Sequence, residues 1–239
     1  MSDKPLLATM TGEYFQPVRL HYRVFDRKAL LQAFNKLRCV DQDPTRPRWV
    51  WLYDFEARHL PFKQSYAQIP KKHHPIVIGS FIPKGEDQMV LDLRSCDRAW
   101  LAIPFFDKHI PRSAARVMEA EVVNRLFSAE ESQISPDQLF DRQETPVCDP
   151  EASVREIAEL TAGIQDPEEK FRIASEHMEA RAKRPLPEIE RFPVHYYEEG
   201  IQTFTTTLTM RQIIAYQHWL GNPSYSMFDI IQEIVQRAK

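Results

Sequence analysis

Glycine is scarce in this 239-residue chain, with six residues at positions 12, 79, 85, 163, 200 and 221, and no two of them are close together. P-loops and dinucleotide-binding loops need clustered glycines between a strand and a helix, because backbone N–H groups must approach the phosphate closely. Neither motif occurs. A G-x-S-x-G elbow, an H-E-x-x-H motif and an EF-hand loop are absent as well. The common nucleotide-binding, serine-hydrolase and zinc-protease classes are therefore disfavoured.

Cysteine is also scarce, and the three residues Cys39, Cys96 and Cys148 form no C-x-x-C pair. An odd number of widely spaced cysteines favours free thiols in a reducing cytoplasm over a disulfide framework or a structural zinc site. No His or Asn partner identifies one of them as a nucleophile. We therefore predict a cytoplasmic protein with no metal and no cofactor.

Long apolar segments are missing. The longest run is AWLAIPFF at 99–106, whereas a membrane-spanning helix needs about 20 apolar residues. The first residues, MSDKPLL, lack the basic and then apolar regions of a secretory signal. The sequence therefore predicts no association with a membrane.

The charge that is present is unevenly divided. Residues 1–128 contain 20 Lys and Arg against 14 Asp and Glu, whereas residues 129–239 contain 11 against 20. Such asymmetry informs on partners rather than on fold. We predict a basic α+β domain at 1–128 and an acidic, mainly helical region at 129–239, which could pack on the first domain or complete it.

Hydrophobic periodicity predicts the elements of the basic region. Alternation of apolar and polar residues indicates a strand at 17–25, and Asp26 can cap a helix at 27–38. A further helix is expected at 114–127, with an apolar stripe that includes Val117, Val122 and Leu126. The remaining expected elements are strands, at 49–56, 75–83, 89–95 and 99–106. This order predicts an α+β fold with a mainly antiparallel sheet and packed helices.

Start signals for helices mark the acidic region. Ser135-Pro136 and Asp166-Pro167 each combine a capping side chain with proline at the first helical position. FPVHYY and IQTFTTTL, at 192–197 and 201–208, indicate a β-hairpin. The expected helices are at 151–162, 167–183, 209–220 and 226–238.

The stretch PRWVWLYDFEAR, at 47–58, places four aromatic residues on one side of the expected strand at 49–56. They are Trp49, Trp51, Tyr53 and Phe55. An open aromatic face could stack the bases of single-stranded nucleic acid. The opposite side carries Asp54 and Glu56, whose burial without partners would be costly. We therefore predict that the aromatic side is core.

Basic residues gather at the ends of this stretch and in the irregular segment 58–74 that follows it. Clustered positive charge of this kind is typical of sites that contact phosphates or acidic proteins. The predicted binding residues are Arg46, Arg48, Arg58, His59, Lys63, Lys71, Lys72, His73 and His74.

The sequence thus predicts a non-catalytic binding or regulatory protein whose basic part engages an acidic macromolecule, with nucleic acid favoured over an acidic protein. The two C-terminal helices could mediate protein contacts or homo-oligomerisation. One alternative is an adaptor or assembly factor without a nucleic-acid role. Another is a metal-dependent nuclease or other hydrolase, in which Asp54, Glu56 and Asp92 would hold a divalent metal.

Overall fold

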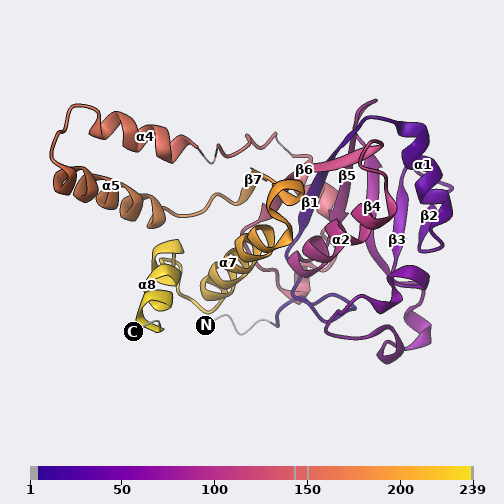
Figure 1. Ribbon diagram of the computed structural model, residues 1–239. Coiled ribbons are helices and arrows are strands. Elements are labelled where there is room, and N and C mark those ends of the chain that lie inside the picture. The colour runs from indigo at the N-terminus through magenta and orange to yellow at the C-terminus, as the bar shows by residue number, and fades with distance from the viewer. Residues whose placement is uncertain (1–4, 143, 150, 238–239) are drawn as a thin grey trace.

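A computed structural model describes residues 5–142, 144–149 and 151–237. Within them the chain forms one seven-stranded antiparallel sheet and eight α-helices (Figure 1), which confirms the predicted α+β class. The strands are β1 (Val18–Val24), β2 (Val40–Gln42), β3 (Trp49–Leu52), β4 (Val77–Pro83), β5 (Gln88–Leu93), β6 (Ala115–Val123) and β7 (Ile189–Pro193).

The helices begin at local capping signals where the sequence provides them. Asp26 accepts a hydrogen bond from the backbone N–H of Ala29, and a reciprocal capping box forms at Ser135. None of the described helices is long and apolar enough to cross a membrane. The helices are α1 (Arg27–Lys36), α2 (Cys96–His109), α3 (Pro136–Phe140), α4 (Ala152–Thr161), α5 (Pro167–Ala182), α6 (Tyr196–Glu199), α7 (Ile201–Trp219) and α8 (Met227–Arg237).

The strands of the sheet lie in the order β2-β3-β4-β5-β1-β6-β7. The first strand of the chain is therefore inside the sheet, where Val18 pairs with Leu93 of β5 and with Val122 of β6. At one edge β7 pairs with β6, so the acidic region contributes a strand to the sheet of the basic region.

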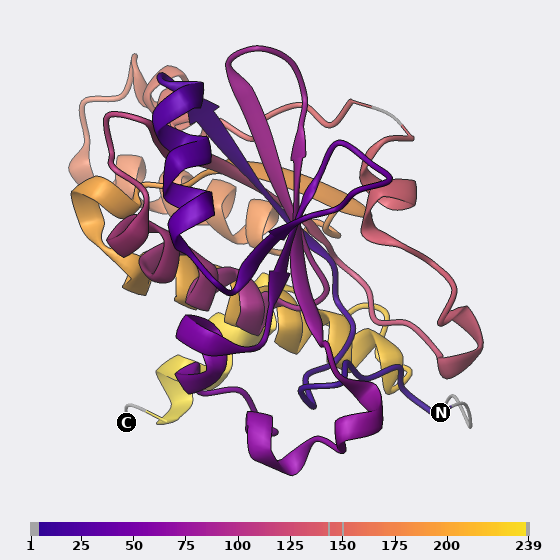
Figure 2. The same ribbon diagram turned by 90° about the vertical axis from the view of Figure 1, so that its right-hand side faces the viewer.

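One face of the sheet carries the main core. In Figure 2 helices α1, α2 and α7 lie on this side of the sheet. Leu20, Phe81 and Leu91 point into the core from three neighbouring strands, and Phe34 and Phe106 meet them from α1 and α2. Burial of apolar side chains contributes about 1.5–3 kcal/mol each, so this layer is the main source of stability.

The second face of the sheet is polar and is only partly covered. Arg19 of β1 binds Asp92 of β5 through two hydrogen bonds of 2.5 and 2.8 Å, and both residues are buried. The segment 124–142 crosses this face (Figure 2), and its α3 places the ring of Phe140 5.0 Å from the Arg19 guanidinium. Asp141 then accepts hydrogen bonds from Arg19 and from Lys84.

The expected aromatic row is confirmed in part. Trp49, Trp51 and Tyr53 are buried on the core face. The strand ends at Leu52, however, and a turn of 3₁₀ helix, Phe55–His59, follows it. Phe55 is 36% exposed because its backbone, with φ of +46°, leaves the strand direction. The predicted burial of Phe55 is therefore wrong, and so is the shared strand face of Asp54 and Glu56.

The strand expected at 99–106 is helix α2. Ser95 caps it by accepting the backbone N–H of Arg98, and Ala99, Ala102 and Phe106 are buried at helical spacing. Pro104 lies inside the helix on its exposed side.

The helix expected at 114–127 is strand β6. Its core residues are Ala115 and Val117, then Ala120 and Val122. A bulge shifts the register against β1 between His21 and Tyr22, so the inward side changes from odd to even positions. This offset produces a spacing that resembles a helical stripe.

The expected hairpin at 192–208 is also absent from the described structure. Its first half overlaps β7, whereas 201–208 is the first part of α7. The β-branched threonines are accommodated there because the hydroxyls of Thr205, Thr207 and Thr209 donate to the carbonyls four residues earlier.

Candidate anion-binding cleft

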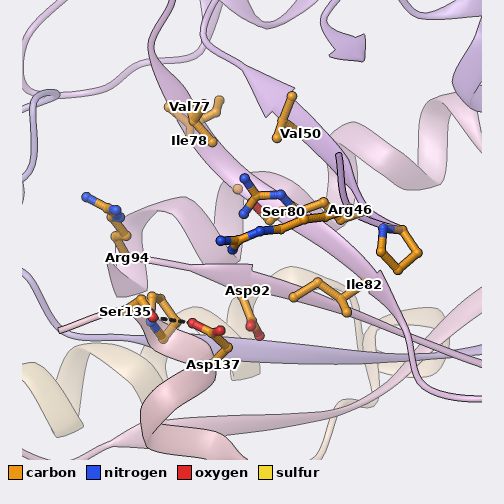
Figure 3. A pocket seen from close by; sticks show the side chains of 14 residues that line it. Arg46, Val50, Val77, Ile78, Ser80, Ile82, Asp92, Arg94, Ser135 and Asp137 are labelled. Atoms are coloured by element: carbon orange, nitrogen blue, oxygen red, sulfur yellow. Dashed lines mark hydrogen bonds between the residues drawn. The ribbon is translucent and has the colours of Figure 1, made fainter. Parts of the chain in front are cut away.

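A cleft of about 440 Å³ lies on the second face of the sheet, between strands β3 to β5 and the start of α3. In Figure 3 Arg46 and Arg94 lie on opposite sides of it, while Ser135 and Asp137 lie at the edge formed by α3. We call this the arginine cleft. Its lining residues are Arg46, Pro47, Arg48, Val50, Val77, Ile78, Gly79, Ser80, Ile82, Asp92, Arg94, Ser135, Pro136 and Asp137.

A tight turn before β3 positions two of the arginines. Asp43 accepts hydrogen bonds from the backbone N–H (2.9 Å) and hydroxyl (2.7 Å) of Thr45, and from Nε of Arg48 (2.7 Å). These bonds hold the pKa of the Asp43 carboxyl well below its usual range. Arg48 is therefore tethered, whereas Arg46, two residues earlier, projects from the turn and is exposed.

The third arginine follows β5. Arg94 is exposed and directly precedes Ser95, the cap of α2. Asp92, two residues earlier, also lines the cleft, but Arg19 holds its carboxylate from the side of β1. Burial raises the pKa of Asp92, and the hydrogen bonds from Arg19 oppose this rise. The pairing leaves Asp92 little capacity to neutralise Arg94.

Arg46 and Arg94 give the cleft positive charge, which the carboxylate of Asp137 at its rim reduces. In the described part of the chain, the side chains of Arg46 and Arg94 form no hydrogen bond or ion pair. Ser80 also lines the cleft, and the hydroxyl of Ser135 donates to Asp137 at the rim. Guanidinium and hydroxyl donors around one cavity can bind an oxyanion such as a phosphate group.

The predicted residues of the segment 58–74 are distributed differently. Arg58 forms an ion pair with Asp54 and covers the ring of Tyr66 at 4.6 Å. His74 bonds to the hydroxyl of Tyr66 at 3.0 Å and to the carbonyl of Ile69 at 3.1 Å. These two residues, and Lys63 with its ammonium 5.0 Å from the ring of Tyr14, are engaged within the chain.

The remaining predicted residues of this segment are exposed. Lys71, Lys72 and His73 form a short 3₁₀ turn, and His59 ends another. We call the segment 58–74 the basic loop. It rejoins the sheet at Val77, which itself lines the arginine cleft, so the loop leads towards that cleft.

The carboxylates of the nuclease alternative have separate partners. Asp54 caps the 3₁₀ turn after β3, Glu56 accepts the backbone N–H of Cys39 at 3.0 Å, and Asp92 binds Arg19. Among the described residues, no group of three or more His, Cys, Asp or Glu side chains is placed to hold a metal ion. Burial, reinforced by Glu56, raises the pKa of Cys39 to about 12, which keeps this thiol protonated at neutral pH.

Sequence reasoning identified Arg46 and Arg48 but not the role of Arg94. Arg94 stands two residues after Asp92, just beyond the end of β5, a spacing that favours the same side of the sheet. Its proximity to Arg46 depends on β4, which lies between β3 and β5 in the sheet. Ser135, predicted as a helix cap, reaches the cleft only because 124–142 crosses the second face.

Comparisons with known proteins add no functional information. No protein-family model, no curated protein and no solved structure matches the chain.

Proposed function

We propose that the protein is a non-catalytic binding or regulatory protein that engages a phosphate-bearing macromolecule, nucleic acid above all, through the arginine cleft and the basic loop. The observation that carries the proposal is the presence of Arg46 and Arg94 at one cleft, both exposed and both without an ion-pair partner in the described structure. Lys71 and Lys72 of the basic loop are exposed as well, and the proposal assigns them further phosphate contacts.

The geometry favours contact with the phosphate backbone over contact with bases. The apolar part of the cleft is aliphatic, formed by Val50, Val77 and Ile82, whereas Trp49 and Trp51 are buried on the other face. Stacking of bases needs an accessible aromatic ring. Binding is therefore expected to be strongly salt-dependent and to show little sequence preference.

A salt series tests the proposal. Binding to single- and double-stranded DNA and RNA is measured for the natural chain, for Arg46→Glu/Arg94→Glu, and for Lys28→Glu as a control. Lys28 is exposed on α1, on the opposite side of the sheet. The loss of each phosphate contact reduces the log–log salt slope by roughly 0.7–0.9, so the double variant should lower it by about twice that amount and the control should not.

The other outcomes separate the alternatives. An absence of binding at ~50 mM salt would overturn the nucleic-acid proposal and leave an acidic protein as the partner. A parallel series with Mg²⁺ or Mn²⁺ addresses the hydrolase alternative, which would gain support from cleavage that is lost in Asp92→Asn. The proposal places the protein in the cytoplasm, and the free thiols of all three cysteines are compatible with that location.

The C-terminal helices support the second candidate function, an adaptor that contacts another protein. A groove of about 680 Å³ between α7 and α8 is lined by Met210, Ile213, Ile230 and Ile234 among others. Ile234 remains 53% exposed although α8 is strongly amphipathic. Ile234→Glu should abolish capture of a partner protein, and equal capture by the variant would contradict this role.

A further inference from the structure

Helices α4 and α5 form an antiparallel hairpin that stands away from the sheet (Figure 1). We call this hairpin the arm. At the end of α5 it meets α8, where the ammonium of Lys183 lies 4.5 Å from the ring of Phe228. Along the rest of its length, one side of α5 faces α4 and another faces solvent.

Contacts with α4 define the inner side of α5. Glu156 of α4 lies 3.0 Å from Nε2 of His177 and 3.8 Å from Nη1 of Arg181. Phe171 and Met178 lie on a different side, and they are 75% and 50% exposed. A single exposed apolar side chain is ordinary, whereas two on one side of a helix form a patch that a partner can cover.

The exposed side of α5 carries a stripe without charge. Phe171, Ser175, Met178 and Ala182 follow one another at intervals of four, three and four residues, the spacing of a helix–helix seam. Large and small residues alternate along it. When a second α5 runs antiparallel with its centre between Ser175 and Met178, each large residue meets a small one.

We infer that α5 pairs antiparallel with α5 of a second copy of the chain, across a two-fold axis. Phe171 of each copy then packs on Ala182 of the other, and Met178 of each copy packs on Ser175 of the other. The charges beside the stripe have the same symmetry. Within one chain Arg172 already pairs with Glu169 and Glu176, and Glu179 pairs with Lys183. In this arrangement Arg172 also faces Glu179 of the second copy, and the pair occurs twice. A parallel pairing places Phe171 against Phe171 and Arg172 against Arg172, so both size and charge select the antiparallel form.

The length of the stripe limits the affinity of the dimer. Phe171 to Ala182 spans about 16 Å of helix, or three turns. A contact of this size is smaller than the roughly 1,200–2,000 Å² of a standard interface. The dimer is therefore expected to dissociate in the micromolar range. This inference does not depend on the function proposed for the arginine cleft.

Sedimentation of the full chain from low to high micromolar concentration tests the pairing. The natural chain should approach twice its monomer mass of 28.1 kDa. Phe171→Glu and Met178→Glu should each weaken dimerisation by at least roughly 30-fold, which is typical of a hot-spot residue. Ala180→Glu is the matched control, because Ala180 is exposed on the same helix but lies outside the stripe. It should leave the dimer intact.

A charge exchange tests the orientation. Arg172→Glu and Glu179→Arg should each weaken the dimer, and the double variant should restore it, because the pair forms again with reversed signs. Circular dichroism checks that α5 remains helical in each variant. A monomer at all concentrations, or a double variant weaker than both single variants, would overturn the inference. Dissociation caused by Ile234→Glu but not by Phe171→Glu would assign self-association to the C-terminal helices instead.

Discussion

Asp141 joins parts of the molecule that are distant in the sequence. Its carboxylate lies 2.5 Å from Nη1 of Arg19 on β1 and 2.8 Å from Nζ of Lys84, beyond β4. Partial burial acts to raise the pKa of Asp141, but the hydrogen bonds from Arg19 and Lys84 outweigh it and lower the pKa below its usual value. One side chain thus fastens the end of α3 to the second face of the sheet.

The lowered pKa of Asp141 predicts a pH-dependent effect of Asp141→Asn. A carboxyl whose pKa is lower in the folded state contributes stability above its unfolded pKa of about 3.9, and this contribution is lost as the pH falls through the folded value. The variant should therefore be less stable than the natural chain at pH 6, and the gap should close as the pH is lowered below about 4. Urea unfolding at several pH values measures the gap, and one that stays constant would contradict the role of Asp141.

The candidate site shows how far the role of a single residue can be predicted from the sequence. Arg46, Lys71 and Lys72 were predicted from the sequence as binding residues, and their side chains are exposed. Arg58 and His74 were predicted with them, but they are engaged with Asp54 and Tyr66. The sequence shows the sign of the charge on a side chain. Only the fold shows whether a neighbouring residue already pairs with that charge.

Among the helices, α2 contains an uncommon residue for its interior. Pro104 has no backbone N–H, so the carbonyl of Trp100 lacks its usual intrahelical donor. The cost of an interior proline is about 3 kcal/mol, offset in part by about 0.4–1 kcal/mol because proline also restricts the unfolded chain.

Pro104→Ala should therefore raise the free energy of unfolding by about 2–2.6 kcal/mol. Denaturant titration measures the change. Lys108→Ala, at another exposed position of α2, is the control and should alter stability by less than about 0.5 kcal/mol. A less stable Pro104→Ala variant would indicate that the proline shapes the packing of α2 on the sheet.

The elements also show why prediction from sequence succeeded in some places and failed in others. Helix starts at Asp26, Ser135 and Ser226 were predicted correctly because the capping side chain and its partner are within a few residues of each other. The strand β6 was not, because its partners β1 and β7 lie elsewhere in the chain and its bulge gives its core residues a helix-like spacing. Capping contacts between residues close in the sequence can be predicted from it, whereas the pairing of distant strands cannot.

On the scale of the whole molecule, the arm is an insertion between two neighbouring strands of the sheet. It lies between β6 and β7, and Val147 before it forms a bridge with Arg191 after it. Both ends of the arm therefore return to the same edge of the sheet. The sheet and its core are therefore complete without α4 and α5.

Replacement of residues 151–184 by about twelve Gly and Ser residues, which span about 19 Å on average, should preserve the sheet. Loss of the contact between Lys183 and Phe228 should lower the free energy of unfolding by no more than about 1 kcal/mol. Denaturant titration followed by tryptophan fluorescence checks this result, and sedimentation should show a monomer. An insoluble or much less stable product would mean that the arm supports the core.

The position of β1 has a consequence for the time at which the protein can fold. Its partners are β5 and β6, which follow it by some 70 to 100 residues, and the edge strand β7 emerges later still. Pairings between such distant segments slow folding, because the loop must close before the contacts form. During synthesis the first strand must therefore wait with its apolar side exposed until about half of the chain has left the ribosome. The protein is thus expected to fold late, and its nascent chain is a natural client for chaperones.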